Sequence, residues 1–210
     1  VATAALSPGD IAAPVREILR RQKNTRIIMG DVIGIDKEKQ IVKTHNGDEF
    51  KFGYLIIATG ARHSYFGNDK WEKFAPGLKT IRDALKIRER ILLSFERAER
   101  CEDEEEKKKH LTFVVVGGGP TGVEMAGAIA EIAKKNMLKE FKSISPEDFQ
   151  IILAEGVDRL LTSFDQPLNN YTKKALESLG VKVMVDKFVK EITEDGVKFD
   201  DELIKTKNVI

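Results

Sequence analysis

The segment from Phe113 to Glu131, FVVVGGGPTGVEMAGAIAE, constrains the fold more than any other part of the chain. It opens with a short apolar run of β-forming residues, which is typical of a buried parallel strand. Glycines then follow at the spacing G-x-G-x-x-G, which allows a tight turn, a close approach of a pyrophosphate and a close helix–strand contact in that order. This context predicts a dinucleotide-binding turn rather than a glycine turn without a ligand. The residues expected to hold the pyrophosphate are Gly117, Gly118, Gly119, Pro120, Thr121 and Gly122.

An acidic residue is expected at the end of the next strand, where it can accept hydrogen bonds from a ribose hydroxyl. The apolar run 149–154 ends at Glu155, which is followed by Gly156. The distance from the first glycine exceeds the usual spacing of about 20 residues, and the long helix and extra connection predicted between them explain the excess. A carboxylate at this position repels a 2′-phosphate, so Glu155 and Gly156 predict a site for NADH. The alternative is an acidic side chain in a solvated loop.

Composition narrows the class of protein. The chain has 210 residues, enough for one large or two small domains. Its formal net charge is +1, so no overall field favours a nucleic acid as partner. We expect no membrane-spanning helix, because no apolar run approaches about 18 residues, and no signal peptide at the N-terminus. We also expect both ends of the sequence to be cuts in a longer protein.

Cysteine and histidine provide little catalytic chemistry. The single cysteine, Cys101, cannot form an intrachain disulfide, so dithiol redox chemistry is not expected. It lies in the charged run 97–110, which predicts the end of a helix and a polar loop. The three histidines are scattered, and no spacing of His and Cys predicts a metal site.

Local patterns predict mixed α and β structure. We expect a hairpin turn at Asn46-Gly47, and a capping box formed by Thr80 and Asp83 at the start of a long helix. Strands are predicted over residues 26–36, 40–45, 49–52, 54–58, 113–116, 149–154, 181–185, 189–192, 197–199 and beyond 203. Helices are predicted over residues 8–22, 81–100, 121–139 and 166–179.

The segment Tyr54–Ala61, YLIIATGA, resembles the strand ending in Ala-Thr-Gly of the two-dinucleotide flavoprotein oxidoreductases. An ordinary turn after a strand is the alternative, and the later GGGPTGVE argues against it. The stretch TGARHSYFGNDKWEKFAPGLKTIRDALKIRERIL closely resembles the bacterial type II NADH dehydrogenases. So do LSPGDIAAPVREILRR and DRLLTSFDQPLNNYTKKALESLGV, and the resemblance covers essentially the whole chain.

This resemblance implies an α/β fold with a Rossmann-like NAD-binding domain and the C-terminal part of an FAD-binding domain that contains a β-meander. The implied division is residues 1–108 for the partial FAD-binding domain with its connecting helix, and 109–210 for the NADH-binding domain. The implied cofactors are FAD and NADH, with hydride passing from NADH to flavin and electrons on to a quinone. The chain would be an internal portion of an enzyme held peripherally on the cytoplasmic face of the bacterial inner membrane, and a homodimer is compatible with it.

The resemblance also implies roles for individual residues. Glu124 would point toward the nicotinamide, although an acid near a helix start also favours the helix dipole. Val32 would contact the FAD adenine through its main chain, with an ordinary core position as the alternative. The residues Ala58, Thr59 and Gly60 would approach the flavin nucleotide. Two other functions stay open: a ferredoxin or nitrite reductase component of the same architecture, and a non-catalytic NAD-binding module.

Overall fold

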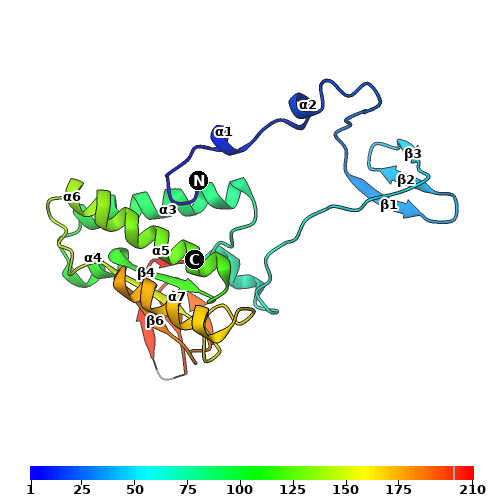
Figure 1. Ribbon diagram of the computed structural model, residues 1–210. Coiled ribbons are helices and arrows are strands. Elements are labelled where there is room, and N and C mark those ends of the chain that lie inside the picture. Colours follow the sequence, from blue (N-terminus) through cyan, green and yellow to red (C-terminus); the bar gives the residue numbers. More distant parts are fainter. Residues whose placement is uncertain (201) are drawn as a thin grey trace. The chain divides into compact units, whose positions relative to one another are not determined.

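The computed structural model describes residues 1–200 and 202–210. Contacts within the chain divide it into two compact units (Figure 1). One unit combines Val1–Ser7 with Arg62–Ile210, and the other is Pro8–Ala61.

The larger unit is built on a parallel four-stranded sheet. Its strands are β4 (Thr112–Val116), β5 (Gln150–Ala154), β6 (Val181–Met184) and β10 (Asn208–Val209), in the spatial order β10-β4-β5-β6. Helix α5 (Pro120–Ile132) follows β4, and helix α7 (Gln166–Ser178) follows β5. The strand order changes direction between β4 and β10, as in a doubly wound nucleotide-binding sheet. The predicted Rossmann-like α/β fold is confirmed.

Both faces of this sheet are buried, which explains why its strands are uninterrupted apolar runs. Phe113 and Val115 of β4 belong to one apolar cluster, while Val114 between them belongs to a second cluster. Ile151 and Ile152 of β5 alternate in the same way. A period of two residues therefore divides each strand between two cores.

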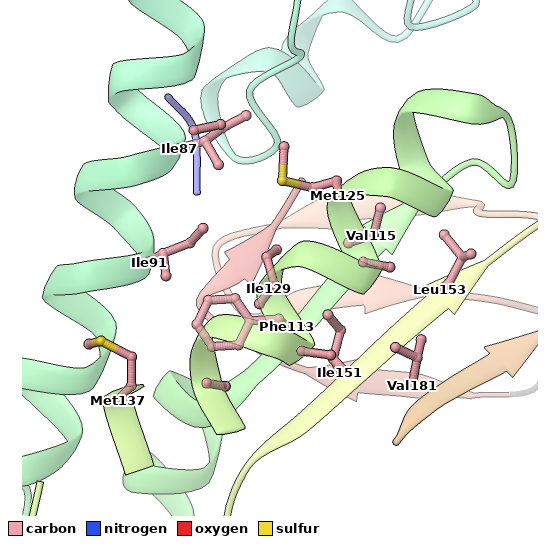
Figure 2. Packing of buried hydrophobic residues seen from close by; sticks show 14 of the residues in the cluster. Ile87, Ile91, Phe113, Val115, Met125, Ile129, Met137, Ile151, Leu153 and Val181 are labelled. Atoms are coloured by element: carbon pink, nitrogen blue, oxygen red, sulfur yellow. The ribbon is translucent and has the colours of Figure 1, made fainter. Parts of the chain in front are cut away.

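Helices α3 (Ile81–Glu99) and α5 cover the first face. Figure 2 shows Ile87 and Ile91 of α3 and Ile129 of α5 gathered over Phe113. The predicted capping box of α3 is present, since Asp83 N–H donates to Thr80 Oγ1 at 3.1 Å and Thr80 N–H donates to the Asp83 carboxylate at 2.9 Å. Because the apolar stripe of α3 is buried on the sheet, this helix packs within the larger unit. The compact units of the structure divide at residues 61 and 62. The division at residues 108 and 109 into a partial FAD-binding domain and an NADH-binding domain stays a prediction.

The second face is covered by a small antiparallel sheet. Its strands β7 (Glu191–Thr193), β8 (Gly196–Lys198) and β9 (Leu203–Lys205) agree with the short strands that the sequence predicts. Trp71, from the 3₁₀ helix η1 (Asp69–Lys73), is buried in the same cluster as Val197 and Phe199.

The helical segment after the glycine turn agrees with the prediction, whereas the charged run after residue 100 does not. The predicted helix over 121–139 is present as α5, the π-helical turn η2 (Ala133–Met137) and α6 (Leu138–Glu140). The charged run after residue 100 is not the expected loop, because α4 (Glu104–Leu111) lies there, capped by the Asp103 carboxylate. Its acidic residues stand in the first turn and its basic residues in the last turn, which matches the helix dipole.

The smaller unit contains the predicted β-meander. Strands β1 (Val32–Asp36), β2 (Ile41–Thr44) and β3 (Glu49–Lys51) pair in sequence order, and Gly47 has a positive φ in the predicted turn. The predicted helix over 8–22 is reduced to the single turns α1 (Pro8–Ile11) and α2 (Val15–Ile18), which are separated at Pro14.

The predicted strand over 54–58 is not formed in this unit. Tyr54 is 100% exposed and Ile56 is 89% exposed. A strand needs a neighbour for its N–H and C=O groups, and none pairs with this segment among the described residues. No helix in the described part of the chain is both long enough and apolar enough to cross a membrane.

Candidate functional site: the glycine turn and Glu155

The glycine motif lies between β4 and α5, at the edge where the parallel strands end. Gly117 has φ +106°, a conformation that L side chains rarely adopt, and its N–H donates to Ala154 O at 2.8 Å. Gly119 is the N-cap of α5, and Pro120 is the first helical residue. The N-terminal N–H groups of α5 therefore start at the turn, where they and the helix dipole favour an anion.

The three motif glycines and Gly118 have different steric surroundings. A Cβ atom at Gly122 would lie 1.9 Å from the Gly117 carbonyl oxygen, so the helix can approach the turn only because this residue lacks a side chain. A Cβ at Gly118 would lie 2.6 Å from Leu160 Cδ2. A Cβ at Gly119 would meet no atom within 4 Å. The space next to the second glycine is open, as a bound pyrophosphate requires.

Glu155 follows β5 directly and reaches across to the turn. Its Oε2 accepts a hydrogen bond from Gly118 N–H at 2.6 Å, and its Oε1 accepts one from Val157 N–H at 3.0 Å. The Glu155 carboxylate is therefore fixed beside the glycine turn, although 37 positions separate it from Gly118. Each oxygen keeps a further acceptor site, so this carboxylate can also accept a hydroxyl.

A second layer of contacts holds the loop after β5 against the glycine turn. Leu161 N–H donates to Gly118 O at 2.8 Å, and Leu160 is buried. The buried Asn169 of α7 donates its side-chain amide to Leu160 O and to Leu161 O. Sequence reasoning did not identify Leu160 or Asn169 as part of the site. The one available signal is an amide side chain on the apolar side of a predicted helix.

Glu124 lies in the second turn of α5, not in the first turn as predicted from a helix start at Thr121. The helix begins one residue earlier, at Pro120, and no acidic residue stands in its first turn. Glu124 is exposed, and within the described residues its side chain forms no hydrogen bond or ion pair. Because the dipole effect fades beyond the first turn, an interaction with the helix dipole explains this acidic residue less well than the sequence suggests.

The residues expected at the flavin lie in the smaller unit. Val32 begins β1 and is 58% exposed, so the alternative that it is an ordinary core residue is wrong. Ala58, Thr59 and Gly60 are exposed, and Gly60 has φ +71°. Small residues and a left-handed glycine leave the backbone of this segment accessible.

The aromatic loop at 62–78 is fixed to the larger unit by Arg90. Its guanidinium donates to Phe74 O and, at 2.9 Å, to Val209 O, and burial lowers the pKa of Arg90. The Tyr65 hydroxyl donates to Ala75 O at 2.5 Å inside the same loop. Arg90 thereby connects the loop to the end of β10.

The described residues contain no group of three or more His, Cys, Asp or Glu side chains able to hold a metal ion.

Comparison with known proteins agrees with this geometry. The chain is 42% identical over 205 residues to the type II NADH:quinone oxidoreductase NdhA of Mycobacterium tuberculosis, which covers 96% of this chain and 44% of that protein. The solved structure of NDH2 from Plasmodium falciparum in complex with NADH matches with a TM-score of 0.87 at 27% identity, over 99% of this chain and 45% of that chain. A ferredoxin reductase from Rhodopseudomonas palustris matches with a TM-score of 0.74 at 17% identity, over 99% of this chain and 46% of that one, which shows a shared fold alone.

The chain thus spans less than half the length of these relatives. The model of one protein family, described as pyridine nucleotide-disulphide oxidoreductase, matches residues 1–210 in full. Together with the glycine turn and the acidic residue that closes β5, this match places the 210-residue chain in the pyridine nucleotide-disulphide oxidoreductase family.

Proposed function

We propose that this chain is the NADH-binding part of a type II NADH:quinone oxidoreductase, a flavoprotein that carries electrons from NADH to a quinone. The observation that carries the proposal is the Glu155 carboxylate fixed beside the Gly118 amide at the N-terminus of α5. This arrangement suits a dinucleotide whose ribose carries no 2′-phosphate. The 42% identity to a mycobacterial type II NADH:quinone oxidoreductase supports the same reading.

In this proposal the glycine turn binds the two phosphates of NADH. Gly119 leaves open space for the pyrophosphate, and the free N–H groups of the first turn of α5 donate to its oxygens. Glu155 accepts a hydrogen bond from the adenosine ribose, and Gly156, directly after it, adds no side chain beside that ribose. Glu124, one turn into the helix and free of other partners among the described residues, contacts the nicotinamide end.

The residues of the smaller unit suit one edge of an FAD site. When bound, FAD would accept hydride from the nicotinamide and pass two electrons to the quinone. The accessible main chain at Val32 and the small residues Ala58, Thr59 and Gly60 would contact the nucleotide part of FAD. The one G-x-G-x-x-G motif of the chain is used for NADH in this proposal, so the remaining FAD contacts must come from other segments of a longer protein.

A ferredoxin or nitrite reductase component, and a non-catalytic NAD-binding module, are the competing functions. The ferredoxin reductase matches in fold alone, whereas NDH2 from Plasmodium falciparum matches more closely in both fold and sequence. We propose a quinone as the electron acceptor of the longer protein, with peripheral binding to the cytoplasmic face of a bacterial inner membrane; a homodimer is compatible with this proposal.

Two measurements test this function. First, the 210-residue chain is titrated with NADH and the nucleotide fluorescence is followed; the absence of saturable binding would contradict the dinucleotide site. Second, the longer flavoprotein is given NADH with either a soluble quinone or a ferredoxin. Rapid quinone reduction is expected, and reduction of the ferredoxin alone would favour the competing assignment.

A further inference from the structure

Phe188 is an exposed aromatic residue beside Glu155. Strands β5 and β6 are parallel neighbours, and the segments that follow them stay together beyond the sheet. Glu155 N–H donates to Met184 O at 2.8 Å, Lys187 N–H donates to Glu155 O at 2.9 Å, and Asp186 N–H donates to Val157 O at 2.9 Å. Backbone hydrogen bonds therefore hold the segment just before Phe188 against the segment that begins at Glu155.

Gly156 makes room for the ring of Phe188. A Cβ atom at Gly156 would lie 3.0 Å from Phe188 Cδ2, which is tighter than an ordinary contact. The ring edge thus occupies the place that a side chain at position 156 would take. Lys190 Nζ lies over the ring, 5.5 Å from its centroid, and Asp200 holds the same ammonium group at 3.2 Å. The ring remains 64% exposed beside these contacts.

The ring does not contribute to the core of the larger unit. Phe188 is 64% exposed and belongs to neither apolar cluster among the described residues, while its neighbour Val189 is buried. A single exposed apolar side chain is common in proteins. This one differs because it is a flat ring that lies against Gly156, directly after the residue proposed to hold a ribose.

The chemistry of the dinucleotide determines what lies beside that ribose. The adenine is attached to the ribose carbon next to the one that carries the 2′-hydroxyl. A base whose ribose is bound by Glu155 must therefore lie close to the same loop ends. Aromatic side chains bind bases by stacking, and they do so without needing a matched set of hydrogen bonds.

We propose that the adenine of the dinucleotide stacks on Phe188, and that Gly156 leaves the space that the edge of this ring occupies. This inference rests on the proposed NADH site. Phe188 is then a determinant of affinity for the adenosine half of the ligand. It has no part in hydride transfer.

The test compares NADH with ADP-ribose, which shares the adenosine diphosphate half but lacks the nicotinamide. Both ligands are titrated into the 210-residue chain, by fluorescence for NADH and by calorimetry for ADP-ribose. Phe188→Ala should weaken both ligands by the same factor, on the order of tenfold, because stacking acts only on the adenine. Phe188→Tyr should bind like the wild type, and Phe188→Leu, which keeps an apolar side chain but no ring, should bind weakly.

Tyr171→Ala serves as the matched control, since Tyr171 is a 72% exposed aromatic residue of α7, and it should leave both affinities unchanged. Equal binding by Phe188→Ala and wild type would overturn this inference and leave the NADH site intact. So would wild-type affinity in Phe188→Leu, or a loss confined to NADH. Failure of the wild-type chain to bind either ligand would instead contradict the dinucleotide site, and the role of Phe188 with it.

Discussion

Glu155 Oε2 lies 2.6 Å from the backbone nitrogen of Gly118, so a carboxylate from the second strand of the nucleotide-binding half braces the turn after the first strand. The same side chain is the proposed ribose acceptor. One residue thus links the position of the glycine turn to the choice of nucleotide. A change at Glu155 should therefore alter the preference for NADH over NADPH. Changes at the glycines should alter either the space for the pyrophosphate or the stability of the fold.

We expect the chain to bind NADH more tightly than NADPH. The Glu155 carboxylate accepts a ribose hydroxyl but repels a 2′-phosphate, and the next two residues, Gly156 and Val157, carry no positive charge. Hydrogen bonds to a charged group contribute about 1.5–3 kcal/mol, so the preference should be at least roughly tenfold. Fluorescence titration with both nucleotides measures it.

Glu155→Gln should reduce this preference, because the amide no longer repels the phosphate. The amide oxygen can keep the hydrogen bond from Gly118 N–H, but the amide NH2 group cannot accept the one from Val157 N–H, so the melting temperature should also fall. Tighter binding of NADPH than NADH by the unmodified chain would remove Glu155 from the ribose site.

Gly119→Val should abolish nucleotide binding while leaving most of the fold intact. The new side chain would point into open space in the free protein, where nothing lies within 4 Å of its Cβ, and would occupy the place of the pyrophosphate. As an N-cap, valine costs about 1 kcal/mol relative to preferred residues. Calorimetric titration with NADH, set beside thermal melting, measures both effects.

Gly122→Ala is the matched comparison, because it changes another glycine of the same motif. Its Cβ would lie 1.9 Å from the Gly117 carbonyl oxygen, so the helix and the turn must separate. Overpacking of this kind costs about 1–3 kcal/mol, and the melting temperature should fall clearly below that of Gly119→Val. Normal NADH binding by Gly119→Val would mean that the glycine motif is purely structural.

The sequence predicts most of the larger unit because its signals are local. The apolar runs of β4, β5 and β6, the capping box at Thr80 and the G-x-G-x-x-G turn each involve residues close together in the chain. The strand predicted over Tyr54–Ala58 is not formed, because pairing depends on a neighbouring strand that no local pattern reveals. Helix α4 was missed because its charges, read as a solvated loop, are ordered by sign along the helix.

The candidate site was predictable where a motif sets the residue type. Gly117, Gly119, Gly122 and Glu155 follow a pattern with a known physical purpose, and the structure brings them together. Asn169 could not be predicted, since its role depends on where the loop after β5 lies against the glycine turn. Val32 is 58% exposed, which does not fit the alternative of an ordinary core residue; its contact with the FAD adenine stays a prediction.

Glu99 should make the stability of the protein depend on pH. The Ser143 hydroxyl donates to the Glu99 carboxylate at 2.7 Å, and this hydrogen bond, with backbone N–H groups of Ser143 and Lys142, lowers the pKa of Glu99. A carboxyl group with a lowered pKa in the folded state stabilises the fold above its ordinary pKa of 4.5. That contribution is lost as the pH falls through the lower, folded-state pKa.

Ser143→Ala should therefore lower the melting temperature near pH 7. The difference from wild type should shrink as the pH falls through the folded-state pKa of Glu99, to the part contributed by the bond from the Ser143 hydroxyl to Glu99 O. Melting curves from pH 7 down to pH 3 measure this trend. Ser178→Ala on α7 is the control, because the Ser178 hydroxyl donates to the Ala175 backbone carbonyl and to no carboxylate among the described residues. A difference that stayed constant over this range would show that Ser143 acts independently of the Glu99 charge.

Replacement of Glu124 by Gln in the longer flavoprotein should slow flavin reduction more than it weakens NADH affinity. A contact that positions the nicotinamide acts on the transition state, whereas the pyrophosphate and ribose contacts supply ground-state binding. If Glu124 only balanced the helix dipole, the same change would cost about 0.3–1 kcal/mol of stability and little rate. Its place in the second turn of α5 makes that cost small. Stopped-flow reduction of the flavin and thermal melting of the same variant separate the two roles. An unchanged reduction rate with a lowered melting temperature would mean that Glu124 only stabilises the helix.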